Sequence, residues 1–213
     1  MYQLPHFRED RLDVQHELIR AHPLGLLVTS GPNGLMANSI PVTLLAGDGD
    51  NGTLRMHLAK ANPQWREFED GCDCLIVFQG AQAYITPTWY ATKHETHKVV
   101  PTWNYATVHV WGKGQVHDDP AWIRAQIDRL TEDREHLRNT PWAVSDAPEP
   151  FVEAQMRGIV GIEVPIQKIE GKWKVSQNQP EPNRLGVQAG LRAEGEHNEA
   201  MAVLVAERGG LLG

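Results

Sequence analysis

The chain has 213 residues, 41% of them hydrophobic and 22% charged, which is enough for one large domain with its own hydrophobic core. The formal net charge is −7, so direct DNA binding is doubtful, because proteins that grip nucleic acid phosphates usually present a basic surface. The sequence has no apolar run of about 18 residues and its opening, MYQLPHFRED, lacks the pattern of a signal peptide, so we expect a cytoplasmic protein without a membrane partner.

The N-terminal half predicts two helices and three strands. Residues 8–23 have helical spacing and end at Pro23. A second helix is expected at 62–71, where Asn62 can cap the first turn. Apolar runs and alternating patterns predict strands at residues 24–30, 35–45 (with Pro41 at an edge or bulge position) and 53–59.

The C-terminal half alternates strands and helices in the same way. The pattern predicts a strand, a short turn and a strand within 72–87, a strand within 102–117, two strands around Gly171 within 158–177, and helices at 119–137, at 147–156 and beyond 180. Asp119 is the expected cap of the long helix. Short strands with helices inserted between them indicate a small closed antiparallel barrel in a single domain, residues 1–213.

Three polar clusters are candidate binding sites. In the first, a strand that carries His57 runs through Lys60 into the helix capped by Asn62, an arrangement that can bind an anion such as phosphate. In the second, alternation from 173 onward places Lys174, Ser176 and Asn178 on one face, where amides and a lysine can hydrogen-bond a flat heteroaromatic ring. The alternatives are a solvated loop lysine in the first and an exposed edge strand in the second.

The third cluster is Asn38 and Ser39 on a strand expected in the core, where polar groups need partners. A bound ligand or the neighbouring backbone could supply these partners. The sequence also contains Pro-Thr-Trp twice, at 87–89 and 101–103. The two copies bracket an irregular stretch between strands, which is a plausible cover for a planar ligand because indole rings stack on such molecules.

Other site chemistries are weakly supported. His94 and His97 have a spacing that serves zinc only if a third ligand joins them, and no such ligand is evident. Haem binding would need one histidine, for example His57 or His109, to face a cavity. No G-x-S-x-G or G-x-G-x-x-G pattern supports a serine hydrolase or a Rossmann site, and the sequence assigns no general acid or base.

The landmarks MYQLPHF, HLAKANPQW, VPTWNY with VHVWGKG, and KVSQNQ leading to GVQAGL are spread from residue 1 to about 191. In these the chain resembles the PaiB-type FMN-binding proteins, often labelled negative transcriptional regulators, which belong to the split-barrel flavoproteins related to pyridoxamine phosphate oxidase. The resemblance implies a mostly β fold with inserted helices, a six-stranded antiparallel split barrel that forms a homodimer, and FMN as the cofactor in a groove at the dimer interface.

The resemblance also implies roles for individual residues. The residues implied to hold the flavin phosphate follow the third strand and are His57, Lys60 and Asn62. The flavin ring would lie against the backbone of residues 38–42, which include Asn38 and Ser39. The late-strand contacts implied are Lys174, Gln177 and Asn178, with Trp103 and Asn104 of the PTWNY motif near the same pocket. Ala59 and Ala61 flank Lys60 where relatives carry arginines or serines, so phosphate binding would depend more on backbone N–H groups.

Two functions follow from this resemblance, with an unknown small-molecule ligand or substrate. One is an FMN-dependent oxidoreductase, in which the cofactor supplies the redox chemistry. The other is a flavin-linked transcriptional regulator that acts indirectly, because the acidic composition argues against direct DNA contact. A haem-binding split-barrel protein, or a regulator without redox catalysis, is the alternative.

Overall fold

The computed structural model describes residues 1–32, 34–69 and 71–211, except for the side chain of His94. These residues form two compact units. Unit 1 comprises Met1–Leu18, Gln79–Val108 and Glu170–Gly213, and unit 2 comprises Ile19–Phe78 and His109–Ile169. Each unit is therefore assembled from segments that are far apart in the sequence. The single domain predicted over residues 1–213 stays a prediction.

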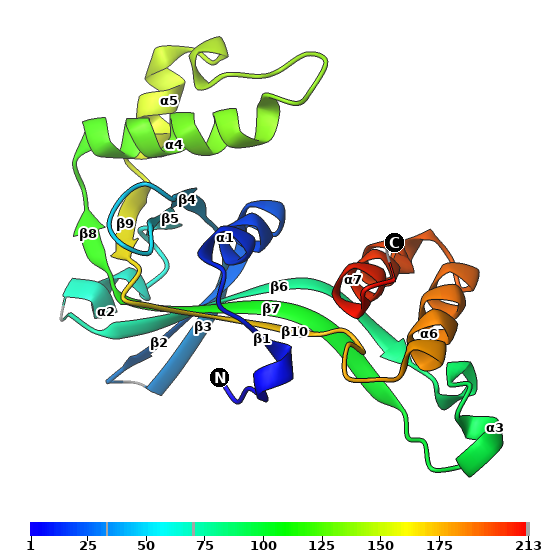
Figure 1. Cartoon of the computed structure of the whole chain (residues 1–213). Coiled ribbons are helices and arrows are strands. Elements are labelled where there is room, and N and C mark those ends of the chain that lie inside the picture. The colour runs from blue at the N-terminus through cyan, green and yellow to red at the C-terminus, as the bar shows by residue number, and fades with distance from the viewer. Residues whose placement is uncertain (33, 70, 212–213) are drawn as a thin grey trace. The chain divides into compact units, whose positions relative to one another are not determined.

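The described strands form two antiparallel sheets (Figure 1). The first has six strands in the order β1-β10-β7-β6-β2-β3, and the second has four in the order β4-β5-β9-β8. The strands are β1 (Arg8–Glu9), β2 (Leu24–Gly31), β3 (Gly34–Pro41), β4 (Thr43–Leu45), β5 (Thr53–Ala59), β6 (Asp73–Ile85), β7 (Thr102–Lys113), β8 (Gln115–His117), β9 (Ile159–Pro165) and β10 (Lys168–Lys174). The six-stranded antiparallel sheet expected from the sequence is present, and a four-stranded sheet accompanies it.

Helices are inserted between these strands, as the sequence predicted. The α-helices are α1 (Leu12–Ala21), α2 (Trp65–Glu69), α3 (Lys93–Thr96), α4 (Pro120–Glu135), α5 (Glu149–Met156), α6 (Glu181–Ala193) and α7 (Glu199–Gly209). Short 3₁₀ segments are η1 (Pro5–Phe7), η2 (Pro87–Trp89), η3 (Val144–Asp146) and η4 (Glu196–Asn198). The predicted cap of α4 is confirmed, because the Asp119 carboxylate accepts a hydrogen bond from the N–H of Trp122 at 2.8 Å.

Unit 2 contains the four-stranded sheet with helix α4 packed on one face (Figure 1). Strands β5 and β9 pair along their whole length, from Thr53 opposite Pro165 to Ala59 opposite Ile159. The interior is closed by fully buried apolar side chains, among them Leu54, Met56, Ile76, Phe78 and Ile162. This burial follows the alternation of the strands, which sends every second side chain to the core.

Unit 1 contains the C-terminal helical pair, α6 and α7, which lie side by side (Figure 1). Val187, Leu191, Met201 and Val205 are buried between them and the rest of the unit. Strand β1 pairs with β10, with Arg8 opposite Lys172 and Glu9 opposite Gly171. The N-terminal segment and a late strand are therefore neighbours.

Several sequence-predicted elements have different bounds in the structure. The strand predicted within 102–117 is divided into β7 and β8, which lie in different sheets, and the helix predicted at 62–71 covers only Trp65–Glu69. The helix predicted at 8–23 begins only at Leu12, because residues 8–9 pair with β10 instead. The strand predicted at 35–45 is divided, since β3 ends at Pro41 and β4 begins at Thr43 in the other sheet. The two strands around Gly171 meet instead at residues 166–167, and Gly171 lies inside β10.

The turn predicted inside 72–87 is absent, and β6 runs unbroken through residues 73–85. The buried positions nevertheless change from even numbers before Gln79 to odd numbers after Gln82. An extra residue inserted into a strand shifts the alternation in this way. The change of phase falls at the Gln-Gly-Ala sequence, residues 79–81, inside the range where a turn was predicted.

Candidate functional site

The turn between β5 and α2 is held against strand β3. The buried Gln64 side chain accepts a hydrogen bond from the Asn38 amide at 2.9 Å and donates to the carbonyls of Leu27 and Met36. Asn62 accepts a hydrogen bond from the Gln64 N–H through its side-chain oxygen at 3.0 Å. Asn38 and Asn62, predicted from separate motifs, are therefore brought together through Gln64, which the sequence reasoning missed.

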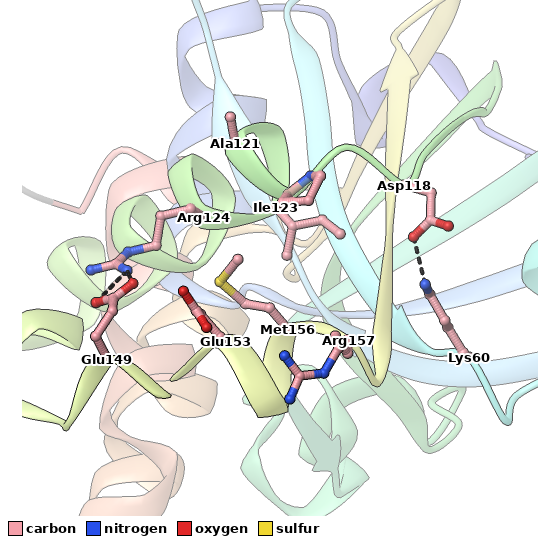
Figure 2. A pocket seen from close by; sticks show the side chains of 10 residues that line it. Lys60, Asp118, Ala121, Ile123, Arg124, Glu149, Glu153, Met156 and Arg157 are labelled. Carbon is pink, nitrogen blue, oxygen red and sulfur yellow. Dashed lines mark hydrogen bonds and ion pairs between the residues drawn. The ribbon is translucent and has the colours of Figure 1, made fainter. Parts of the chain in front are cut away.

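Lys60 lies at the edge of a pocket of about 610 Å³ in unit 2 (Figure 2). Its ammonium group is 2.6 Å from a carboxylate oxygen of Asp118, whose side chain is 63% exposed. The first residues of α4, Pro120 and Ala121, also line this pocket. The N-terminus of a helix presents free backbone N–H groups and favours negative charge.

Two further cations, Arg124 and Arg157, line the same pocket as Lys60, together with the carboxylates of Asp118, Glu149 and Glu153. No sequence pattern had indicated Arg157. Strand pairing brings it near Lys60, because the Lys60 N–H donates to the carbonyl of Gly158 at 2.8 Å. Within the described part of the chain, no hydrogen bond or ion pair joins the Arg157 guanidinium to another side chain. Figure 2 shows Arg157 between the Lys60–Asp118 pair and the Arg124–Glu149 pair, with Met156 and Glu153 beside it.

His57 lies apart from Lys60, on the face of the four-stranded sheet that helix α4 covers. It pairs with Gly161 on β9, and a Cβ added at Gly161 would overlap the Trp122 ring of α4. Burial lowers the pKa of His57, and its Nδ1 atom has no hydrogen-bond partner. The neutral imidazole is therefore favoured. The predicted phosphate contact from His57 is not tested by this placement and stays a prediction.

Strand β3 is the last strand in the order of the six-stranded sheet, so one of its sides has no strand neighbour there. Ser39 is exposed on this strand. Unpaired backbone N–H and C=O groups on an edge strand can bind another strand or a ligand with matching donors and acceptors. The edge thus fits the predicted contact between the backbone of 38–42 and a flavin ring.

The hairpin of β2 and β3, together with β6, has an exposed apolar face. Leu24, Leu26 and Leu35 are 62%, 40% and 80% exposed. Leu26 lies between Ser39 and Val77 in the strand register, and these three side chains share one face. Contiguous exposed apolar surface of this kind marks a site of association.

A second pocket, of about 290 Å³, lies in unit 1 and is built from the sequence landmarks. MYQLPHF contributes Leu4, His6 and Phe7, the segment around PTWNY contributes Val100, Thr102 and Asn104, and KVSQNQ contributes Lys174, Ser176, Asn178 and Gln179, with Tyr90 beside them. We call this the unit 1 pocket. Motifs separated by more than a hundred residues meet here because β10 lies between β1 and β7.

Lys174 is tied to the start of β7. Its ammonium group donates to the Thr102 hydroxyl and to the carbonyl of Trp103, the latter at 2.5 Å. Burial, and then the charge of Lys172, lower the pKa of Lys174. Asn104 is 1% exposed and donates its amide to the Ser176 hydroxyl at 2.9 Å.

Gln177 holds the turn after β10 and does not line the unit 1 pocket. Its amide donates to the carbonyls of His6 and Trp173, and its oxygen accepts from the N–H of Val175. Ser176 has a φ of 65°, a conformation that is unusual for a residue other than glycine. The alternation predicted across 173–178 thus ends at Lys174, where the strand stops.

The two Pro-Thr-Trp copies have different surroundings. Trp103 is 54% exposed and makes an edge contact with Tyr84, with ring centroids 6.0 Å apart. Trp89 packs against α6, where side chains at Gly186 and Gly190 would overlap its backbone and ring. Tyr90 is 3% exposed. Trp89 and Tyr90 therefore anchor the segment after β6. The ligand-covering role of Trp103 stays a prediction.

The described residues give little support for a metal or haem site. In residues 1–32, 34–69 and 71–211, no three His, Cys, Asp or Glu side chains are grouped to hold a metal. The side chain of His94 lies outside the described set. His109 contacts the ring of Trp111, with centroids 5.8 Å apart. Cys72 and Cys74 form no disulfide, and burial raises the pKa of the Cys74 thiol to about 12.

The residues of unit 2 fit the phosphate and ring of FMN. Lys60 and Arg157 supply positive charge at one pocket, where Arg124 is paired with Glu149 and Lys60 with Asp118. The turn at 62–64 links Lys60 to the edge strand β3 through Gln64 and Asn38. Asp118 must release Lys60 for a phosphate to pair with it, and its exposure makes this inexpensive. No helix among the described residues is long and apolar enough to cross a membrane.

These features define a mostly β, antiparallel, split-barrel protein with a pocket lined by basic and acidic side chains. Residues 1–168 match the family model described as "Putative FMN-binding domain", and the chain belongs to this FMN-binding family. It is 34% identical to an uncharacterized protein of Emericella nidulans over 98% of both chains. It is 29% identical to the protease synthase and sporulation protein PAI 2 of Bacillus subtilis, again over 98% of both.

The fold also resembles a solved structure, the flavocytochrome Anf3 from Azotobacter vinelandii. The TM-score is 0.57 at 10% identity, and the match covers 81% of this chain and 72% of that one. At this identity the likeness shows the fold alone.

Proposed function

We propose that this protein is an FMN-dependent oxidoreductase whose flavin phosphate binds between Lys60, Arg157 and the N-terminus of α4. The observation that supports it most is that three basic side chains, Lys60, Arg124 and Arg157, line one pocket, and that Arg157 has no side-chain partner there in the described structure. Three carboxylates, Asp118, Glu149 and Glu153, line the same pocket. When bound, FMN supplies electron transfer to or from a small substrate. The chain's own groups would hold the phosphate, orient the ring along β3 and exclude water from its face.

The predicted contacts divide between the two units. Asn38, Ser39 and Asn62 belong to unit 2 and support a ring position along the outer edge of β3. Trp103, Asn104, Lys174, Gln177 and Asn178 belong to unit 1 and remain predicted contacts to the flavin. The resemblance implies that the late-strand residues among them, Lys174, Gln177 and Asn178, often reach the cofactor from the other subunit.

Comparing FMN with riboflavin tests the phosphate assignment, because riboflavin has the same ring and no phosphate. Lys60→Met should weaken FMN binding by about tenfold or more, the value of one charge-assisted hydrogen bond, and should leave riboflavin affinity unchanged. Asp118→Asn should strengthen FMN binding only, since it removes the competing carboxylate. Flavin fluorescence titration measures both affinities.

Lys113→Met is the matched control, because Lys113 is exposed in the same unit and does not line the pocket. It should change neither affinity. If the wild-type protein binds FMN and riboflavin equally well, no phosphate site exists and the assignment of Lys60 and Arg157 is wrong.

The proposed homodimer would form through the apolar face of β2, β3 and β6. Among the paired residues of β2, β3 and β6, the side chains on this face are uncharged, and Asp73 lies at the end of β6. The same face of two copies can therefore pack together even though each chain has a net charge of −7. Leu26→Lys should give a monomer in light scattering after size exclusion. Leu137→Lys, at a leucine that is 83% exposed elsewhere, should leave the dimer intact; a monomeric wild-type protein would refute the proposal.

A flavin-linked regulator is the second candidate, and the similarity to the Bacillus subtilis sporulation protein favours it. The acidic composition supports an indirect action, and we expect no specific gel shift with genomic fragments at physiological salt. Haem binding, which the likeness to a flavocytochrome brings into question, would give the purified protein a Soret band. A cytoplasmic location stays a prediction.

A further inference from the structure

The unit 1 pocket is positively charged and contains no carboxylate. Lys174 and His6 are the titratable bases that line it, and none of its lining residues is Asp or Glu. Lys172, on the same face of β10, adds a second positive charge nearby. Lys172 itself is 9% exposed and donates to the carbonyl of Tyr2 at 3.0 Å.

Neither lysine has an acidic partner in the described part of the chain. Lys172 lies over the rings of Tyr2 and Tyr105, and Lys174 is bonded to a hydroxyl and a carbonyl. The nearest acidic residue on β10, Glu170, is 2.5 Å from the N-terminal amine of Met1. Cations removed from water without a counter-ion are costly, and a bound anion offsets that cost.

The pocket also has the shape and donors for a small ligand. An ammonium group has three donors and Lys174 uses two within the protein, so one remains for a ligand. Asn178 adds an exposed amide. Leu4, Phe7 and Val100 make part of the lining apolar. The Gln177 hydrogen bonds hold the turn after β10 in place in advance, which limits the entropy lost on binding.

We propose that the unit 1 pocket binds a small organic carboxylate, with its carboxylate on Lys174 and its apolar body against Leu4 and Phe7. The ligand would be a substrate or effector, and this role for Lys174 and Asn178 is the alternative to the flavin contacts that the resemblance implies for them. This inference goes beyond FMN binding, and it does not depend on where the phosphate of FMN is held.

Benzoate is a suitable probe, and benzamide is its neutral counterpart of nearly the same shape. We expect saturable benzoate binding in ligand-observed NMR, with about millimolar affinity for so small a molecule, and no saturable benzamide binding. Lys174→Met should weaken benzoate binding by about tenfold or more, and Lys174→Arg should retain it. Lys98→Met, at an exposed lysine of the same unit, should bind as the wild type does.

Three outcomes overturn the proposal. These are equal binding of benzoate and benzamide, no saturable benzoate binding, and wild-type affinity in a Lys174→Met protein whose circular dichroism shows it is folded. Repeating the titration with FMN-saturated protein separates this inference from the proposed function. Competition between FMN and benzoate would assign the pocket to the flavin and refute a separate site. Benzoate binding by a protein that does not bind FMN would support this site and refute the proposed function.

Discussion

Glu9 joins three segments of unit 1, and its removal should destabilise the fold in a pH-dependent way. Its side chain is 6% exposed. It accepts hydrogen bonds from the N–H and guanidinium of Arg11 and lies 2.6 Å from the guanidinium of Arg208 on α7. Arg208 in turn lies over the ring of Trp173 on β10, 5.5 Å from its centroid. The carboxylate therefore ties β1 to the C-terminal helix.

The expected loss of unfolding free energy follows from the pKa of Glu9. Burial by itself raises this pKa, but the hydrogen bonds from Arg11 and the charges of Arg208 and Arg11 outweigh burial and lower it from 4.5 to about 2. Such a shift corresponds to about 3 kcal/mol of unfolding free energy. Arg11 is 59% exposed, so solvent screening reduces the effect, and we expect Glu9→Gln to cost about 2 kcal/mol at pH 7.

The sign of the pH dependence is fixed by the direction of this shift. A carboxyl group whose pKa is lowered on folding contributes stability that is fully present above its unfolded pKa of 4.5 and is lost as the pH falls toward 2. Urea unfolding of the wild-type and Glu9→Gln proteins at pH 7, 5.5, 4 and 3 should therefore show a difference that is constant at first and then shrinks.

Glu17→Gln is the matched control, because Glu17 is exposed on α1 in the same unit. It should change the unfolding free energy by less than about 0.5 kcal/mol at each pH. An equal loss for Glu9→Gln at pH 7 and pH 3 would show that shape and not charge is responsible, and no loss at pH 7 would refute the ion-pair reasoning.

Two further predictions concern the Pro-Thr-Trp segments. The first tests the packing of Trp89 against α6, and the second compares the roles of Trp89 and Trp103. Gly190→Ala should lower the unfolding free energy by about 1–3 kcal/mol in urea titration, because the new methyl group would overlap the Trp89 ring. This loss is expected even though alanine favours helices more than glycine does. Gly47→Ala is the control: its methyl group would meet no atom within 4 Å, so it should lower the unfolding free energy by less than about 1 kcal/mol. Trp103→Ala should weaken FMN binding in a fluorescence titration and have little effect on the unfolding free energy. Trp89→Ala should lower the unfolding free energy, because it removes a packed side chain, and have little effect on FMN affinity. Equal effects of the two tryptophan variants on FMN affinity would contradict the different roles that we assign to them.

Sequence periodicity predicted most elements because their causes are local. The Asp119 cap lies next to the helix that it begins, and the alternation of 53–59 is visible in the strand itself. The errors arose where tertiary pairing overrides a local signal. Residues 8–9 have helical neighbours but pair with β10, and the Gln-Gly-Ala sequence lies in a continuous strand.

The residues of the candidate sites also differ in whether the sequence alone could identify them. Residue types and motifs were sufficient to select Lys60, Asn62, Asn104 and Lys174, because each lies in a short pattern with an evident chemistry. Arg157 could not be selected, since nothing near it in the sequence shows that the pairing of β5 with β9 brings it close to Lys60.

The sequence by itself determined most of the helices and strands, the acidic character of the chain and the motifs that place it in an FMN-binding family. Only the tertiary structure decided that the N-terminal motif, PTWNY and KVSQNQ form one pocket, and that Lys174 lines it, with Lys172 nearby, without an acid in the lining. The physical reason is that burial and the pairing of distant strands are properties of the folded chain, whereas caps and alternation depend on neighbours in sequence.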